Sequence, residues 1–142
     1  MRNIMVATDG SEGANRAVDF AAELAKAFGC KLSIVTVSDN LSGEEMKQLA
    51  RAERNIGDAL EALSRQILTA ASARAQHLGI TDVQLRTGWG DPAQSIIDFG
   101  GREAADAIVL GRRGRGRLAG LLLGSVSQKV ASLAPCAVVV VP

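Results

Sequence analysis

The sequence is poor in aromatic residues: it has three phenylalanines, one tryptophan and no tyrosine among 142 residues. A core of this chain must therefore be built from valine, isoleucine, leucine and alanine. A row of aromatic side chains that stacks on single-stranded nucleic acid is not supported either. The net charge of +1 gives no general attraction to nucleic acid or to an anionic membrane. Any charge that serves a function must be local.

Other chemistry-bearing features are also scarce. Cys30 and Cys136 lie far apart without a CxxC motif, which argues against a zinc site or a thioredoxin-type pair. We expect two buried thiols. His77 is the only histidine and has no second ligand at metal-binding spacing, so no metal site is expected. No apolar run reaches the roughly 18 residues of a membrane span, and residues 1–10 show no signal-peptide pattern. We therefore expect a cytoplasmic protein without a membrane partner.

What the sequence does contain is a regular alternation of short apolar runs and helical periodicities. The runs predict strands at residues 3–8, 31–37, 83–87, 107–110 and 137–141. The periodicities predict helices between Ser11 and Gly29, at about 43–77, from Asp91-Pro92 onward, and at 118–133. We expect the Gly100-Gly101 pair to fray or shorten the third helix, because glycine is unfavourable inside helices.

Strands that alternate with helices indicate a parallel sheet with helices on both faces. Right-handed crossovers then favour a doubly wound α/β fold with five strands. No internal repeat or linker interrupts the pattern, so residues 1–142 are interpreted as one domain. In such folds a ligand binds beyond the carboxyl ends of the strands.

One segment at this edge stands out. Residues 111–117, GRRGRGR, contain three glycines and four arginines directly after the expected fourth strand. Glycines let backbone N–H groups approach phosphate oxygens, and arginines add charge-assisted hydrogen bonds. The segment is neither a P-loop, which needs GxxxxGK[ST], nor a Rossmann fingerprint, which follows the first strand. A phosphate cradle and a solvated basic loop both remain open at this point.

The spacing Gly111-x2-Gly114-x9-Gly124-Ser125 resembles the G-x2-G-x9-G-[ST] signature of the ATP-binding branch of the universal stress protein family. The resemblance covers the whole chain. Residues 6–11, VATDGS, resemble the first strand and acidic turn of that family, residues 107–111 its fourth strand, and residues 135–142 its closing strand. It implies a regulatory protein of the stress response with a sheet in the order 3-2-1-4-5.

The resemblance also implies a set of ligand contacts. It places Ala7, Thr8 and Asp9 near the adenosine and Val37 against the adenine. A ribose and phosphate loop would comprise Leu110, Gly111, Arg113 and Gly114, and a second phosphate cradle Gly124, Ser125, Val126 and Ser127. Arg112 and Arg113 depart from the small, polar or histidine residues that family members often have there. Asp9 lacks the acidic partner and distant lysine of a receiver domain, so a ribose or magnesium-water contact is the interpretation, with turn capping as the alternative.

The implied ligand is ATP, with Mg²⁺ held only through the bound triphosphate. We assign no catalytic residue: Ser125 has no histidine partner, and nothing positions a water, so any hydrolysis should be slow. Two alternatives remain. One is a nucleotide-free module for protein interaction. The other is an adenylating enzyme, which needs an SGGxDS-type loop that residues 9–13, DGSEG, match poorly. The signalling partner, a protein, is not identified by the sequence.

The closing strand predicts an assembly. Val138, Val139, Val140 and Val141 form an uninterrupted apolar run, which the strand order of the family places at a sheet edge. An apolar edge without lysine or internal proline invites pairing with another chain. The family resemblance likewise implies pairing through this strand. We therefore expect a homodimer.

Overall fold

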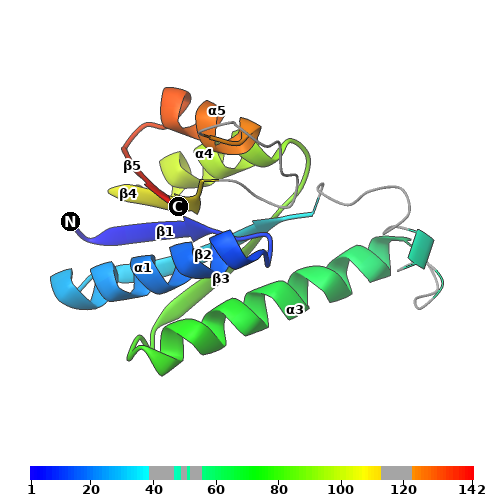
Figure 1. Cartoon of the computed structure of the whole chain (residues 1–142), viewed down its shortest axis with the longest axis horizontal. Helices are drawn as coiled ribbons and strands as arrows, with labels where there is room; N and C mark the ends of the chain where they lie inside the picture. Colours follow the sequence, from blue (N-terminus) through cyan, green and yellow to red (C-terminus); the bar gives the residue numbers. More distant parts are fainter. Residues whose placement is uncertain (39–46, 49–50, 52–55, 113–122) are drawn as a thin grey trace.

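The structure, a computed structural model, describes residues 1–38, 47–48, 51, 56–112 and 123–142. Within these ranges strands and helices alternate along the chain (Figure 1). The elements are β1 (Asn3–Ala7), α1 (Glu12–Phe28), β2 (Lys31–Val37), α3 (Ile56–His77), β3 (Val83–Gly88), α4 (Pro92–Arg102), β4 (Ala107–Gly111), α5 (Ser125–Leu133) and β5 (Ala137–Val141).

The strands form one parallel sheet in the order β3-β2-β1-β4-β5. The predicted fold class, a single doubly wound α/β domain with this strand order, is confirmed. The chain steps outward from β1 to β2 and β3, then returns to the other side of β1 for β4 and β5. The order therefore reverses between β1 and β4.

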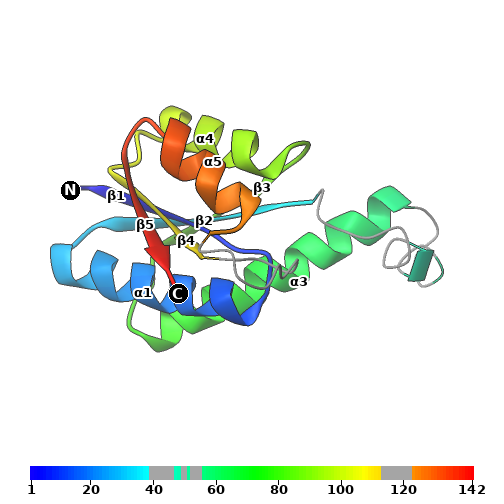
Figure 2. The same cartoon turned by 45° about the horizontal axis from the view of Figure 1, so that its top comes forward.

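Helices cover both faces of the sheet (Figure 2), and alternate residues of the inner strands pack into two separate cores. Ile4, Val6 and Ile34 pack with α1 and α3 on one face. Met5 and Ile108 pack with α4 and α5 on the other. Because β1 and β4 are buried on both faces, they appear in the sequence as continuous apolar runs. The edge strand β3 is half exposed, and its sequence, VQLRTG, mixes apolar and polar residues.

The predicted helix caps are present. Ser11 accepts a hydrogen bond from the Ala14 N–H at the start of α1, and Gly29 ends α1 with φ of 65°. Asp91 caps α4 by accepting from the Gln94 N–H. In the ranges listed above, no helix is both long enough and apolar enough to cross a membrane.

Two expectations need correction. Cys30 and Cys136 are half-buried and not fully buried. The last helix begins at Ser125, with Gly124 as its N-cap, and not near residue 118. The helix predicted at about 43–77 is confirmed from Ile56 to His77, and its first part stays a prediction. Residues 39–46, 49–50 and 52–55 lie outside the described ranges, as do residues 113–122.

The expected fraying at Gly100-Gly101 was wrong, because α4 continues through both glycines to Arg102. The reason lies in packing. A Cβ at Gly100 would stand 2.7 Å from Cδ1 of Ile108, which is fully buried beneath the helix. The absent side chain lets α4 approach the sheet closely, and this contact offsets the low helix propensity of glycine.

This packing predicts opposite effects at neighbouring positions. Gly100→Ala should lower the free energy of unfolding by about 1–3 kcal/mol through overpacking against Ile108. Gly101→Ala, where an added Cβ meets nothing within 4 Å, should raise it by about 0.5–1 kcal/mol. Urea denaturation of the parent and both variants measures the pair. Equal effects of the two substitutions would contradict this explanation.

Candidate nucleotide site at the carboxyl edge

The carboxyl ends of the strands converge at one edge of the sheet, and the switch point lies between β1 and β4. Ala7 and Gly111 are the last residues of these two strands, and Val37 is the last residue of β2. Parallel α/β sheets bind ligands in the crevice at this place. The sequence-predicted residues on three strands therefore share the edge where a ligand is expected.

The turn after β1 satisfies its own backbone. The Thr8 hydroxyl accepts from the Gly10 N–H at 3.1 Å, and the Asp9 carboxylate accepts from the Ser11 N–H at 2.9 Å. Ser11 in turn caps α1. Thr8 is buried and Asp9 is half-buried. The backbone donors of Gly10 and Ser11 are thus already engaged, and Asp9 adds an acidic side chain to this side of the crevice.

The end of β4 lies directly against the start of α1. A Cβ on Gly111 would stand 3.0 Å from the carbonyl carbon of Gly13, 3.1 Å from its oxygen and 3.3 Å from the Ala14 nitrogen. These are backbone atoms and cannot move aside as a flexible side chain could. Glycine at 111 is therefore favoured by packing, independently of any ligand.

Beyond Gly111 the chain is fixed by hydrogen bonds to β5 and to the first turn of α5. The Arg112 N–H donates to the Val141 oxygen at 2.7 Å, and the Arg112 oxygen accepts from the Gly124 N–H at 2.8 Å. The Ser127 hydroxyl lies 2.7 Å from the Gly111 oxygen and 3.1 Å from the Arg112 oxygen. These bonds hold the end of β4 against β5 and the first turn of α5.

The first turn of α5 differs from the starts of α1 and α4, which have side-chain caps. Its N-cap is Gly124, which has no side chain to accept a hydrogen bond from its N–H groups, and no side-chain cap is found in the described part of the chain. The first intrahelical bond runs from Gln128 to Gly124, so the N–H groups of residues 125–127 have no partner within the helix. The first turn also contains no acidic residue. Such a terminus favours an anion through both its donors and the helix dipole.

At β2 and β3 the edge is closely packed and polar. Val37 is half-buried and pairs in register with Gly88. A Cβ on Gly88 would stand 2.3 Å from the Ser95 hydroxyl oxygen and 3.0 Å from Cε2 of Phe99. The hydroxyls of Ser38 and buried Ser64 lie 3.2 Å apart. Sequence reasoning missed this hydroxyl pair, because no spacing rule relates Ser38 to a residue on α3.

The loop after β3 holds the tryptophan. Trp89 is 56% exposed between Gly88 and Gly90, and Gly90 has φ of 86°. Asp91 follows, and the hydrogen bond from the Gln94 N–H, with a further one from Lys129, holds the pKa of its carboxyl below the usual range. The Lys129 Nζ atom lies 3.1 Å from Oδ2 of Asp91, and this ion pair links α5 to the start of α4.

The structure gathers most of the predicted site residues. Ala7, Thr8, Asp9, Val37, Leu110 and Gly111 lie at or next to strand ends, and Gly124, Ser125, Val126 and Ser127 lie at the start of α5. Leu110 and Ser127 are buried, and Ser125 is exposed. Arg113 and Gly114 lie outside the described ranges. Among the described residues, no group of three or more histidine, cysteine, aspartate or glutamate side chains could hold a metal.

Comparison with known proteins identifies the family. The family model of the universal stress proteins matches residues 1–142. A universal stress protein of Thermus aquaticus is 37% identical over 99% of this chain and 98% of its own length. The chain belongs to the universal stress protein family.

Solved structures of this family share the fold. A universal stress protein in complex with cAMP is 32% identical, has a TM-score of 0.75, and aligns over 99% of this chain and 97% of its own. A universal stress protein from Lactobacillus plantarum is 24% identical, with a TM-score of 0.79 and the same coverage of both chains. The second supports the fold alone.

Substitution of two serines in α5 of this universal stress protein should have different effects on its stability. Ser127→Ala removes the hydroxyl that bonds the Gly111 oxygen and should lower the free energy of unfolding by about 1 kcal/mol. Ser125→Ala changes an exposed side chain and should alter it by less than about 0.5 kcal/mol. Thermal and urea denaturation provide the comparison. A Ser127→Ala protein as stable as the parent would show that this bond does not hold the β4 end.

Proposed function

We propose that this chain binds ATP at the carboxyl edge of the sheet and acts as a regulatory nucleotide-binding protein of the stress response. The observation that carries the proposal is the first turn of α5, which has no side-chain cap and no acidic residue and lies at the switch point. The phosphates would bind there, with the adenosine toward Asp9 and Val37. Gly111, Arg113 and Gly114 would complete the loop around ribose and phosphates, and Mg²⁺ would be held through the triphosphate.

Electrostatics favours this orientation over the reverse. The crevice is bordered by two helix starts, those of α1 and α5. The start of α1 is capped by Ser11 and carries Glu12 in its first turn, with Asp9 just before it. Negative charge there repels a phosphate. The start of α5 is hydrogen-bonded to Arg112 through the Gly124 N–H, and its N–H groups have no side-chain cap. A polyanion is therefore stabilised on that side.

The adenosine end of the nucleotide suits the side of the site formed by the ends of β1 and β2. A carboxylate such as Asp9 accepts hydrogen bonds from ribose hydroxyls or from an exocyclic amine, and Val37 provides apolar surface for a base. A relative 32% identical to this chain was solved with cAMP, which supports an adenine nucleotide as the ligand class. No residue identified here activates a water, so hydrolysis, if present, is expected to be slow.

The proposal makes a specific demand on Ser125. Ser125→Ala should weaken ATP about ten- to hundredfold, since a hydrogen bond to a charged group is worth about 1.5–3 kcal/mol, while adenosine should bind as before. Ser132→Ala, an exposed serine in the last turn of α5, is the matched control and should change neither. Calorimetry with ATP, cAMP and adenosine measures all three proteins, and Trp89 fluorescence gives a second signal.

Two results would overturn the proposal. If the parent does not bind ATP at millimolar concentration, the nucleotide-free interaction module becomes the better interpretation. If Ser125→Ala binds ATP as tightly as the parent, the phosphates do not lie on the first turn of α5.

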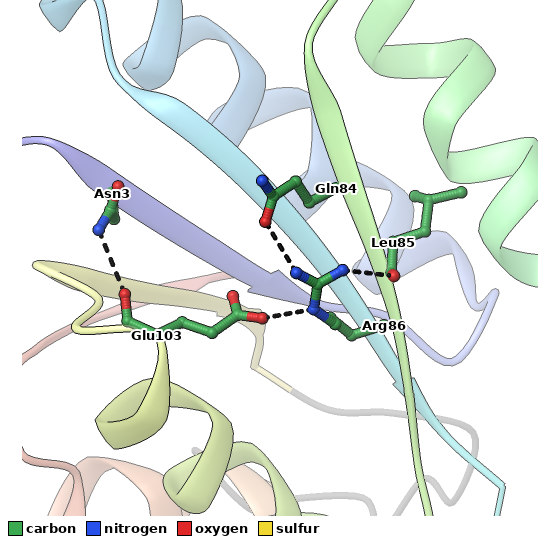
Figure 3. Close-up of polar contacts among 5 residues, drawn as sticks. All are labelled: Asn3, Gln84, Leu85, Arg86 and Glu103. Atoms are coloured by element: carbon green, nitrogen blue, oxygen red, sulfur yellow. Dashed lines mark hydrogen bonds and ion pairs between the residues drawn. The ribbon is translucent and has the colours of Figure 1, made fainter.

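We further propose a homodimer through β5, and the two sheet edges give a physical reason. At the β3 edge, the Gly88 oxygen accepts from the N–H of Ser38, which directly follows β2, so by alternation the Leu85 carbonyl faces the open side. The Arg86 guanidinium bonds this carbonyl at 3.1 Å and also contacts Glu103 and Gln84 (Figure 3). A charged side chain thus guards the β3 edge against pairing.

The β5 edge has no such guard in its sequence. The Val141 oxygen accepts from the N–H of Arg112, which directly follows β4, so the backbone groups of Val138 and Val140 face the open side by the same alternation. The four valines are half-buried in the single chain. A second copy that pairs along β5 would satisfy these backbone groups and cover the exposed part of the valines.

The alternation of residue directions along β5 also shows which substitution tests the dimer best. Val139 and Val141 pack against the core beneath α1, so lysine at these positions would disturb the fold itself. Val140→Pro instead removes an N–H that faces the open edge and leaves the bonds to β4 intact. We expect a folded monomer from this variant and a dimer from the parent in analytical ultracentrifugation. A monomeric parent at micromolar concentration, or a dimeric Val140→Pro protein, would contradict pairing through β5.

A further inference from the structure

The side chain of Arg112 carries an unexplained polar group. Its Nε atom is buried and has no hydrogen-bond partner in the described structure. A buried donor without an acceptor costs free energy, and the cost is larger when the donor belongs to a charged group. Buried polar groups of this kind call for an explanation, and a ligand that supplies the acceptor is one.

The position of Arg112 is set by the fold and not by its own side chain. Its N–H is bonded to Val141 of β5, and its carbonyl oxygen accepts from Gly124 and lies within reach of the Ser127 hydroxyl. Residue 112 therefore stands between the end of β4 and the first turn of α5. Such backbone anchoring pre-organises the root of the side chain before any ligand arrives.

Arg112 also lies beside the donors assigned to the phosphates. The Gly124 N–H that bonds its carbonyl belongs to the N-cap of α5, the helix whose first-turn N–H groups have no side-chain cap. An anion at this turn would thus lie near the backbone of a residue whose side chain has an unused buried N–H. Arginine pairs with phosphate more strongly than a neutral donor does, because the bond is charge-assisted.

We propose that Arg112 is a phosphate-contacting residue whose Nε–H donates to a phosphate oxygen of the bound nucleotide. This proposal rests on the nucleotide function proposed above. It adds that Arg112 makes the affinity for the nucleotide depend on its phosphates. The glycine signature itself does not assign this role, since Arg112 occupies one of its unspecified positions, Gly111-x2-Gly114.

The test compares ligands that differ only in their phosphates. Dissociation constants for adenosine, AMP, ADP and ATP are measured by calorimetry for the parent, Arg112→Gln, Arg112→Lys and the control Arg102→Gln. Arg102 is exposed at the end of α4, at the opposite edge of the sheet, so its substitution removes the same charge far from the site. Thermal denaturation shows whether each variant is folded.

We expect Arg112→Gln to weaken ATP about ten- to hundredfold and to leave adenosine within twofold of the parent. Arg112→Lys should lose as much, because lysine keeps the charge but has no Nε–H at that point of the side chain. The step in the series at which the loss first appears identifies the phosphate contacted. Arg102→Gln should bind all four ligands like the parent.

Other outcomes would overturn the inference and leave the nucleotide function standing. They include an Arg112→Gln protein that binds ATP within twofold of the parent, an equal loss for adenosine and ATP, and an Arg112→Lys protein that binds ATP normally. An equal loss would indicate a structural role for Arg112. Failure of the parent itself to bind ATP would instead refute the proposed function.

Discussion

The close approach of β4 to α1 is the constraint on which the candidate site depends. Gly111 packs against the backbone of Gly13 and Ala14, where even a methyl group would meet atoms at 3.0–3.3 Å. The pairing of β1 with β4 brings their ends together, and the glycine lets the start of α1 lie directly against the end of β4. A larger residue at 111 would press on the backbone of the α1 start, whatever the chemistry of the residues that border the site. The glycine thus acts on the site through packing, before any contact with a ligand is considered.

The two helix starts that border this crevice are chemically opposite. At the α1 start, Ser11 caps the Ala14 N–H, Thr8 and Asp9 bond the N–H groups of the preceding turn, and Glu12 lies in the first turn. The α5 start has a glycine at its N-cap, which provides no side-chain cap for the first-turn donors. A ligand with one anionic end and one neutral, polar end fits this asymmetry in only one direction. Capping residues, which usually contribute to helix stability alone, therefore define the polarity of the site.

The strands and the helix caps could be predicted from the sequence, because they follow from local rules. Continuous apolar runs give buried parallel strands, Ser11 and Asp91 are recognisable caps, and Gly29 ends a helix in the left-handed region. What the sequence does not show depends on contacts between distant elements. Gly100 stays in a helix because Ile108 lies beneath it, and Ser127 bonds the Gly111 oxygen instead of facing outward. The start of α5 was also misplaced, since a glycine N-cap carries no side-chain signal for the boundary.

The contrast between the two sheet edges connects assembly to the site. Arg86 occupies the open carbonyl of β3, whereas β5 exposes the backbone of a valine run. The last backbone hydrogen bond of β5 runs from the Arg112 N–H to the Val141 oxygen. The residue whose Nε has no partner therefore also holds the carboxyl end of β5. A phosphate that binds the Arg112 side chain would restrain the same residue that positions Val141. Through this shared residue, occupancy of the proposed site and the order of the β5 edge would act on one stretch of backbone.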